Sequence, residues 1–335
     1  MTDTAATVLC NTANPAPVRP LASVRRTSSI DVEWLDGIMG NRVFHGRVRD
    51  FRTPADGSAG QVLAAAEMRA VLDFSKAIQS IEATPAPARM QQLVGAKGGG
   101  HLRMLIRDVM PELIDNADPL YLALDDISGV SLISTWALTL WHPELLATMQ
   151  EAMPPEQRQK FQDRAGVCWG LKPGNSGLLE DRPTGQVGKA FGGELRNPAD
   201  PEGWHLFPEI AGVSMRRARR IDVRLDRDAG VIHVDSAFQD SAPRPDGTRA
   251  ALHEYRLEAE IDAATLELRR LTPDPRVLPF PECPGAIHNA QRLVGGRLPD
   301  IRDAVLAQLR GPEGCTHLND ALRALADVPR LVEQL

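Results

Sequence analysis

The chain has few of the residues that would place it in a specialised class of protein. Of its 335 residues, only 4% are aromatic and only four are cysteines. Four cysteines in so long a chain are too few for a disulfide framework, so we expect a reducing compartment and metal-binding or reactive thiols. No stretch approaches the roughly 18 apolar residues of a membrane-spanning helix, and residues 1–23 do not resemble a signal peptide. We predict a cytoplasmic protein without a membrane partner.

Positive charge is not in excess either. The formal net charge is -6, and the basic residues are dispersed along the chain. This distribution argues against a nucleic-acid partner, which would require a basic stripe or patch. The chain also lacks a Walker loop, a dinucleotide-binding glycine fingerprint and a nucleophile elbow, so we expect no nucleotide cofactor. What remains, 43% hydrophobic and 24% charged, is the composition of an ordinary globular protein.

Two stretches of the chain look like diverged copies of one module. The tripeptide Leu-Val-Gly occurs at residues 93–95 and again at 293–295, and Asp50 matches Asp240, each shortly before an Asp-Gly turn. On this alignment, Ala66 lies opposite His253. Such a long period predicts two tandem domains, because solenoid repeats span about 20 to 50 residues. The alternative is a chance likeness between two Arg- and Leu-rich segments.

The same order of elements is predicted in each copy. Alternating or β-branched patterns between turn residues predict strands at 29–34, 42–51, 61–74 and 77–84, and later at 220–226, 231–238, 252–262 and 266–273. Apolar residues three and four apart then predict helices at 88–95 and 101–110, and later at 288–295, 301–310 and 317–328. We predict an α+β fold in which each copy is an antiparallel meander followed by helices that cover one face of the sheet.

These patterns divide the chain into four parts. We expect a disordered tail at residues 1–23, a first copy at 24–135, and a second copy at 215–335. Residues 136–214 are predicted to form a helical hairpin and a Gly/Pro-rich linker or lid, across which the two copies face one another. The protein would then be a monomeric pseudo-dimer or a homo-oligomer.

Chemistry is expected in the second copy. Asp240 ends one predicted strand, His253 opens the next, Cys283 begins a helix, and Cys315 and His317 begin the last helix. Thiolates and imidazoles suit zinc or iron, and helix N-termini stabilise thiolates. We predict a divalent metal held by Cys283, Cys315, His253 and Asp240, with catalytic roles for His317, His253 and Asp240. Alternatively, the cysteines are inert buried residues.

Two further sets of side chains are candidates for substrate binding. Trp169 and Trp204 flank the Gly-rich linker, and with His205 they could line an apolar pocket between the copies. The alternative is that these tryptophans fill the interface of a pseudo-dimer. The arginines of residues 216–220 could receive a carboxylate or phosphate. Alternatively, this run is a solvated strand edge.

The second copy also carries motifs of known families. From about Arg216 to Leu325 it resembles a bacterial family of unknown function, through a Cys-Pro-Gly turn at 283–285, the Leu-Val-Gly at 293–295 and a Gly-Cys-Thr-His-Leu box at 314–318. More distantly, it is similar to the U-type iron–sulfur scaffold family, where an Asp and three Cys surround zinc or a nascent cluster. That resemblance implies ligand roles for Cys283, Cys315 and Asp240. The chain departs from it by lacking the early cysteine.

Three function classes follow. The leading hypothesis is a metal-dependent enzyme acting on a small, partly apolar organic substrate by lyase, isomerase or hydrolase chemistry, with the metal as Lewis acid or activator of water. The first alternative is a sulfur- or cluster-handling scaffold of the U type. The second is a ligand-binding module without catalysis.

Overall fold

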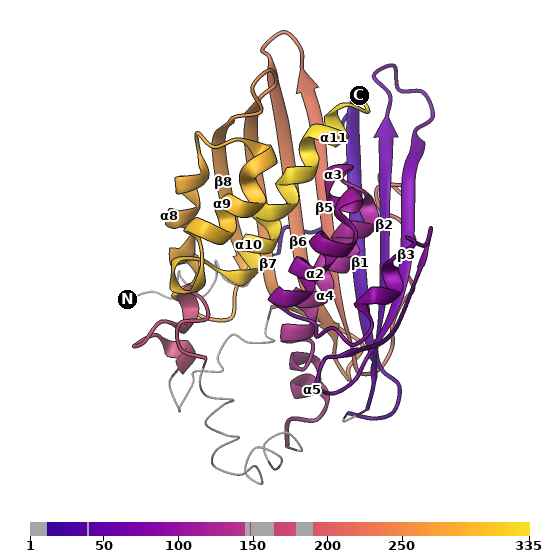
Figure 1. The fold of residues 1–335 in the computed structure, drawn as a ribbon, viewed down its shortest axis with the longest axis vertical. Helices are drawn as coiled ribbons and strands as arrows, with labels where there is room; N and C mark the ends of the chain where they lie inside the picture. The colour runs from indigo at the N-terminus through magenta and orange to yellow at the C-terminus, as the bar shows by residue number, and fades with distance from the viewer. Residues whose placement is uncertain (1–11, 39, 145–147, 149–163, 179–189) are drawn as a thin grey trace.

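A computed structural model describes residues 12–38, 40–144, 148, 164–178 and 190–335. At its centre lies one eight-stranded antiparallel sheet in the order β4-β3-β2-β1-β5-β6-β7-β8 (Figure 1). The strands are β1 (Ser23–Trp34), β2 (Arg42–Thr53), β3 (Gln61–Leu72), β4 (Ile78–Thr84), β5 (Ser214–Asp226), β6 (Val231–Pro243), β7 (Arg249–Asp262) and β8 (Leu268–Val277). Every strand predicted from the sequence is present, and the α+β class is confirmed.

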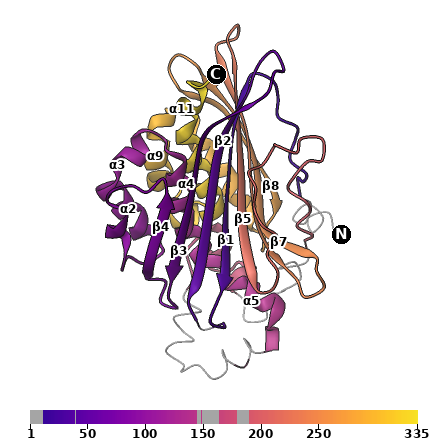
Figure 2. The same ribbon diagram turned by 90° about the vertical axis from the view of Figure 1, so that its right-hand side faces the viewer.

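The helices of both halves lie on one face of this sheet, as Figures 1 and 2 show. The α-helices are α2 (Gly100–Val109), α3 (Pro111–Asp115), α4 (Pro119–Ile133), α5 (Trp136–Trp141), α8 (Ala286–Ala290), α9 (Ile301–Gln308), α10 (Thr316–Ala324) and α11 (Val328–Val332). The 3₁₀ helices are η1 (Met90–Leu93), η2 (Trp169–Leu171), η3 (Ser176–Leu178), η4 (Cys283–Gly285), η5 (Gln291–Leu293), η6 (Leu298–Asp300), η7 (Gly311–Glu313) and η8 (Leu325–Asp327).

Helix α4 is the longest of the helices that the sequence patterns missed. Its residues are buried on almost every side, so it lacks the polar face that gives a surface helix its periodicity. The helices predicted at 101–110, 301–310 and 317–328 are present as α2, α9 and α10. The predicted helical hairpin in the 136–214 segment lies mostly outside the described residues. In the part of the chain that the structure describes, no helix has both the length and the apolar character needed to cross a bilayer.

The sequence predicted two copies that face one another across residues 136–214. In the structure, the two halves instead join edge to edge in one sheet. β1 pairs with β5 in antiparallel register, with Ser28 opposite Arg219. The reason is that the first strand of each half would otherwise leave a row of unpaired N–H and C=O groups. One continuous sheet therefore carries two apolar cores, one under β2–β4 and one under β5–β8.

Corresponding residues of the two halves make the same contacts. The side-chain amides of Gln91 and Gln291 donate to carbonyls of β4 and β8, at 2.8 and 2.9 Å. The main-chain N–H groups of Gly95 and Gly295 donate to the first residues of those strands, also at 2.8 and 2.9 Å. Both glycines have positive φ, 86° and 87°, which glycine adopts without strain. The Leu-Val-Gly segment thus closes the same turn in each half.

The sheet also repeats an irregularity. The register shifts in β2–β3 directly after Asp50, and in β6–β7 directly after Asp240. Asp50 faces Ala64, and Asp240 faces His253. The residue of β3 that takes the place of His253 in this pairing is Ala64, whereas the sequence alignment set Ala66 opposite His253.

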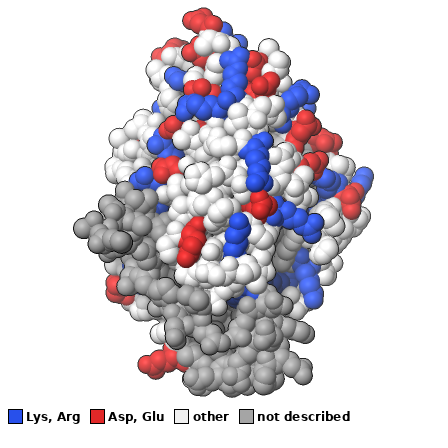
Figure 3. All heavy atoms as spheres, turned by 90° about the vertical axis from the view of Figure 1, so that its left-hand side faces the viewer, with Lys and Arg blue, Asp and Glu red and all other residues white. Residues whose placement is uncertain are grey.

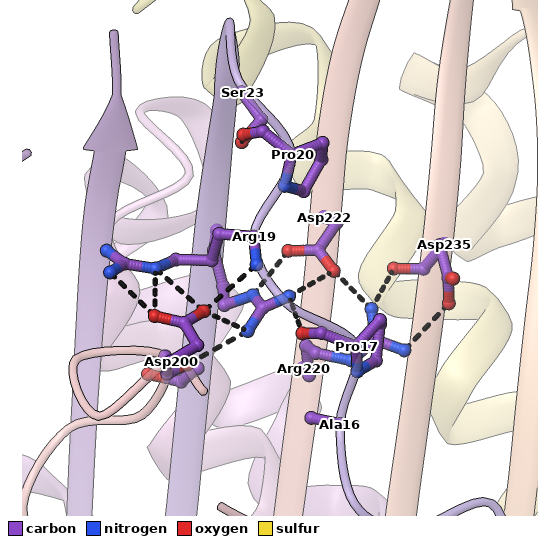
Figure 4. Close-up of polar contacts among 12 residues, drawn as sticks. Ala16, Pro17, Arg19, Pro20, Ser23, Asp200, Arg220, Asp222 and Asp235 are labelled. Carbon is purple, nitrogen blue, oxygen red and sulfur yellow. Dashed lines mark hydrogen bonds and ion pairs between the residues drawn. The ribbon is translucent and has the colours of Figure 1, made fainter. Parts of the chain in front are cut away.

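Extended segments cover the other face of the sheet. Residues 12–22 run along it beside residues 190–212, and Ala16 N–H donates to Leu195 O at 3.1 Å. Arg19 and Asp200 join the segments through a salt bridge of 2.8 Å, seen in Figure 4. Residues 12–22, which the sequence placed in a disordered tail, are therefore held against the sheet by the charge pair and the main-chain bond. Residues 1–11 lie outside the described part.

Candidate functional site

Three side chains of the second half converge on the helix-covered face of the sheet. Asp240 on β6 lies directly opposite His253 on β7, and the first turn of α10 brings His317 over them. His253 Nδ1 is 3.3 Å and His317 Nε2 is 3.9 Å from Asp240 Oδ2. The two imidazole rings stack with their centroids 3.5 Å apart and their planes 17° from parallel. Three of the residues predicted from the sequence thus form one cluster.

Two nitrogen atoms of this cluster have no conventional partner. The residues are buried, with exposed fractions of 0% for Asp240, 6% for His253 and 7% for His317. Neither His253 Nδ1 nor His317 Nε2 makes a hydrogen bond of acceptable geometry with any described residue. A buried polar atom without a partner destabilises a fold by about 1–3 kcal/mol, so native structures usually satisfy it. These two nitrogens beside Asp240 therefore lack a hydrogen-bonding or metal partner among the described residues.

Arg217 holds the carboxylate of Asp240 in place. Its Nε lies 2.7 Å from Oδ1 and its Nη2 3.0 Å from Oδ2, the bidentate geometry of an arginine fork. Burial alone would raise the pKa of Asp240, but the charge of Arg217, the hydrogen bonds from Arg217 and the neighbouring His253 outweigh it. The pKa is therefore well below its usual range, and Asp240 is ionised near neutral pH.

The two histidines are neutral near neutral pH. Burial lowers the pKa of His253, although Asp240 opposes the shift. Burial also lowers the pKa of His317, and the neighbouring His253 lowers it further. A neutral imidazole keeps one nitrogen lone pair, which can accept a proton or bind a metal ion.

A buried network of charged side chains contacts the cluster through Arg217. Arg217 Nη1 also lies 3.1 Å from Asp126 on α4 and 2.9 Å from Asp320 on α10. The other members of the network, from α2, α4, α10 and β5, are Arg103, Asp125, Arg219 and Arg323. The sequence carried a signal for this network, since Asp125 and Asp126 interrupt an otherwise apolar run. The reading of residues 216–220 as a solvated strand edge was wrong, because β5 is central and its arginines are buried.

The cysteines lie apart from the cluster. Cys283 begins η4 and Cys315 caps α10, and both are free and buried in the apolar core of the second half. Among the described residues, the potential metal-binding group comprises Asp240, His253 and His317 and includes no cysteine. Burial raises the pKa of Cys315 to about 11 and raises that of Cys283 still further, which favours the neutral thiols. Two of the four predicted ligands, Asp240 and His253, therefore belong to this group, and Cys283 and Cys315 do not.

The predicted pocket of Trp169, Trp204 and His205 is not assembled. Trp169 packs with the helix-side core of the second half, and Lys172 Nζ lies 3.4 Å from the centroid of its ring. Trp204 and His205 lie on the opposite face of the sheet. There the ring nitrogens of His205 contact the hydroxyls of Ser29 and Thr27 at 2.8 and 2.9 Å. The sheet separates these side chains because the two linker segments that carry them pass on different sides.

Residues 215–330 match the family model DUF2889, described as a protein of unknown function. The match runs from β5 into α11 and includes all three residues of the Asp240 cluster. Searches of curated proteins and of solved structures found no match. The similarity to the U-type scaffold family remains a prediction, as does the absence of a nucleic-acid partner. On the face that Figure 3 shows, acidic and basic side chains are interspersed.

Proposed function

We propose that Asp240, His253 and His317 bind a divalent metal ion and that the protein is a metal-assisted enzyme acting on a small, partly apolar organic substrate. The observation that carries the proposal is the pair of buried, unpartnered imidazole nitrogens that lie 3.3 and 3.9 Å from one carboxylate oxygen. Two imidazoles and a carboxylate are a donor set that suits zinc or iron(II). When bound, the ion would supply Lewis acidity or activate a water molecule.

The distances from Asp240 Oδ2 to the two imidazole nitrogens fit a shared metal ion, whereas the orientation of the two imidazole rings fits it less well. Ligand atoms bound at about 2.0–2.2 Å in a tetrahedron lie about 3.3–3.6 Å apart, close to the observed distances. Stacked rings, however, direct their lone pairs side by side rather than at a common point. Binding of one ion therefore requires one imidazole to turn about its χ2 bond. His317 is the candidate to turn, since its Nε2 is the more distant from Asp240.

A second candidate function uses the same residues without a metal. The stacked rings, and the engagement of both Asp240 oxygens by Arg217, favour an acid–base pair in which Asp240 orients His253. His253 Nδ1–H would face the carboxylate, and Nε2 would carry the lone pair that removes a proton from substrate. In that case, His317 is a positioning residue that packs on the base.

The sulfur-scaffold alternative is the weaker one. Persulfide transfer begins with attack by a thiolate, whereas the raised pKa values of Cys283 and Cys315 favour thiols. Both sulfurs also lie in an apolar core, out of reach of a partner protein.

Metal analysis of the untagged protein separates these functions. We expect about one zinc or iron per chain in the wild type, and loss of most of it in His317→Ala because this substitution removes one of three ligands. The double variant Cys283→Ser/Cys315→Ser should keep its metal. His101→Ala, at an exposed helix position, is the control for loss of an imidazole.

Two results would contradict the metal site. If neither the purified protein nor protein titrated with zinc binds an ion, the acid–base function replaces it. If the cysteine double variant loses the metal while His317→Ala keeps it, the ligand set is the one predicted from the sequence.

We also infer that the two halves descend from one duplicated unit. The repeated Gln and Gly contacts and the repeated register shifts after Asp50 and Asp240 support this origin. Two ion pairs across the β1–β5 boundary also support it. Arg25 on β1 pairs with Asp222 on β5, and Arg216 on β5 pairs with Asp31 on β1. Such reciprocal pairs are typical of a two-fold interface.

A further inference from the structure

A groove on the face of the sheet opposite the Asp240 cluster, formed by β5–β7 and residues 190–204, holds residues 12–19 largely through their main chain. Figure 4 shows part of this segment, from Ala16 to Pro20, in front of the strands. The N–H groups of Ala13 and Ala16 donate to Glu254 and to Leu195 O, and Asn197 and Arg25 donate to the carbonyls of Ala16 and Pro17. Because such bonds do not depend on side-chain type, a peptide of another sequence can form them here.

The groove also contacts one charged side chain of the segment. Arg19 donates to the carboxylate of Asp200 from Nε at 3.0 Å, from Nη2 at 2.8 Å and from its main-chain N–H at 2.9 Å. Asp200 is 5% exposed, and Arg25 Nη1 lies 3.5 Å from it. A buried carboxylate that meets two nitrogens of one guanidinium selects arginine at that position of a bound peptide.

The apolar pocket of the groove is larger than the side chain that it holds. Ala16 is the buried residue of the segment and packs against Ala218, Leu195 and Trp204. The same residues line a cavity of about 220 Å³, whose floor also includes Ala237 of β6. Since a cavity of about 150 Å³ is large enough for benzene, this one has room for a side chain of the size of leucine.

Little apolar surface holds the segment in place. Apart from Ala16, its residues are exposed or half-buried, and Val18 and Leu21 are 52% and 56% exposed. Its remaining contacts are polar, and polar contacts exchange for bonds to water with a small net change in free energy. A peptide that fills the pocket can therefore displace it.

We propose that this groove binds a short peptide segment of a partner protein, with a large apolar side chain at the position of Ala16 and an arginine three residues later. Residues 12–19 occupy it as a tethered, displaceable ligand. A second copy of this chain would bring the same alanine and leave the pocket underfilled, so the pocket favours another sequence. The groove is independent of the function proposed for Asp240, which lies on the other face of the sheet.

Fluorescence anisotropy with labelled peptides tests the proposal on the full-length protein. The peptides have the sequence of residues 12–20, with and without Ala16→Leu, and the protein carries Arg19→Ala to loosen its own segment. We expect saturable binding of the leucine peptide and about tenfold weaker binding of the parent peptide, because fewer carbon atoms are buried. The wild-type protein should bind both peptides more weakly, since its tethered segment competes at an effective concentration on the order of 1 mM.

Two further variants, made in the Arg19→Ala protein, locate the peptide. Ala237→Leu fills the pocket from its floor and should remove the preference for the leucine peptide, whereas Ala65→Leu, at an exposed alanine of β3, should keep it. Asp200→Asn should remove the preference for peptides with arginine over peptides carrying Arg19→Gln.

Alternative variants cover a loss of folding, as judged by circular dichroism. If Arg19→Ala does not fold, Asn14→Ala loosens the segment instead, because it removes a bond of 2.8 Å to Gly192 O. If Ala237→Leu does not fold, Ala218→Leu fills the pocket from β5.

Three results would overturn the proposal. The first is the absence of saturable binding of the leucine peptide to the loosened protein. The second is equal binding of the leucine and parent peptides, or a preference that persists in a folded, pocket-filled variant, which would put the peptide elsewhere. The third is dimerisation of the loosened protein in sedimentation equilibrium that excludes the peptide, which would make the segment of a second copy the occupant.

Discussion

At the scale of single residues, Arg217 links the parts of the candidate site. Its guanidinium contacts Asp240 on β6, Asp126 on α4 and Asp320 on α10, and the residue is 0% exposed. Three carboxylates around one buried guanidinium are stable together, but none of them is stable alone in this setting. The residue that orients the site therefore also holds helices from both halves against the sheet.

Replacing Arg217 is expected to cost the protein much of its stability. In Arg217→Met, the buried carboxylates lose their common partner, which typically destabilises a fold by about 3–5 kcal/mol. Arg217→Lys should restore only part of this loss, since an ammonium group cannot form the bidentate contact. Urea unfolding would measure both changes. Arg270→Met, which removes a half-exposed ion pair with Glu260, is the control and should change stability by at most about 1 kcal/mol. A similarly small effect at Arg217 would contradict a structural role for the network.

At the scale of elements, α4 packs unusually close to the charge network. A Cβ atom added at Gly129 would lie 2.4 Å from Arg217 Nη1 and 2.6 Å from Asp320 Oδ2. A glycine inside a helix normally weakens it, by about 0.5–1 kcal/mol relative to alanine. Here the missing side chain is what allows the helix to approach the guanidinium.

Gly129→Ala should therefore destabilise the protein, against the usual effect of this substitution in a helix. We expect a loss of about 1–3 kcal/mol in the free energy of unfolding, because the methyl group overlaps buried charged atoms. Gly100→Ala at the start of α2 is the matched control, since nothing lies within 4 Å of the added atom. Thermal or urea unfolding would compare the two variants. A more stable Gly129→Ala variant would show that α4 can move away from the network.

At the scale of the whole molecule, the face opposite the helices depends on a neutral histidine. His205 holds residues 190–212 to β1 through Ser29 and Thr27. Burial lowers its pKa to about 3, and the charges of nearby arginines add to the shift. The unfolded chain takes up a proton on this residue below about pH 6.5, whereas the folded protein does not. Stability from this group is thus present above pH 6.5 and lost as the pH falls towards 3.

The loss of stability on acidification should be less steep without this histidine. Each such group contributes a slope of up to about 1.4 kcal/mol per pH unit. We expect His205→Gln to be less stable than the wild type at pH 7.5 but to lose less stability between pH 6.5 and 4.5. Urea unfolding at a series of pH values gives both slopes, with His101→Gln as the exposed control. Identical slopes for wild type and His205→Gln would show that the residue is protonated in the folded state.

The edge-to-edge joint of the two halves makes a further prediction at this scale. Residues 213–335 alone expose β5, and two copies pairing about Arg219 would set Arg216 opposite Asp222 twice. In such a dimer, the two Arg219 side chains would meet at the centre of the strand pair. The substitution Arg219→Ser removes this clash, because it puts at this position the residue type that lies opposite Arg219 in the intact protein, Ser28 of β1. We expect this fragment to form a dimer in sedimentation equilibrium.

Asp222→Arg provides the control for this dimer. It puts two guanidinium groups opposite each other, so it should weaken the dimer. A folded, monomeric fragment would contradict the inferred duplication interface.

The sequence by itself determined the eight strands, several of the helices and the half of the chain that holds Asp240, His253 and His317. Alternation, turn residues and helical spacing are local properties, so the strands and the helices α2, α9 and α10 could be predicted. The residues Asp240, His253 and His317 could be chosen by chemical type. The tripeptides ending at Gly95 and Gly295 marked the turns, because a positive φ favours glycine.

Only the tertiary structure decided which of these residues meet. Asp240 faces His253 because of a strand register with a shift beside it, and His317 arrives from a helix that is distant in the chain. Packing also placed Cys283 and Cys315 in an apolar core, away from the cluster. Register, and the face on which a linker passes, depend on contacts between residues far apart in sequence, which local periodicity does not encode.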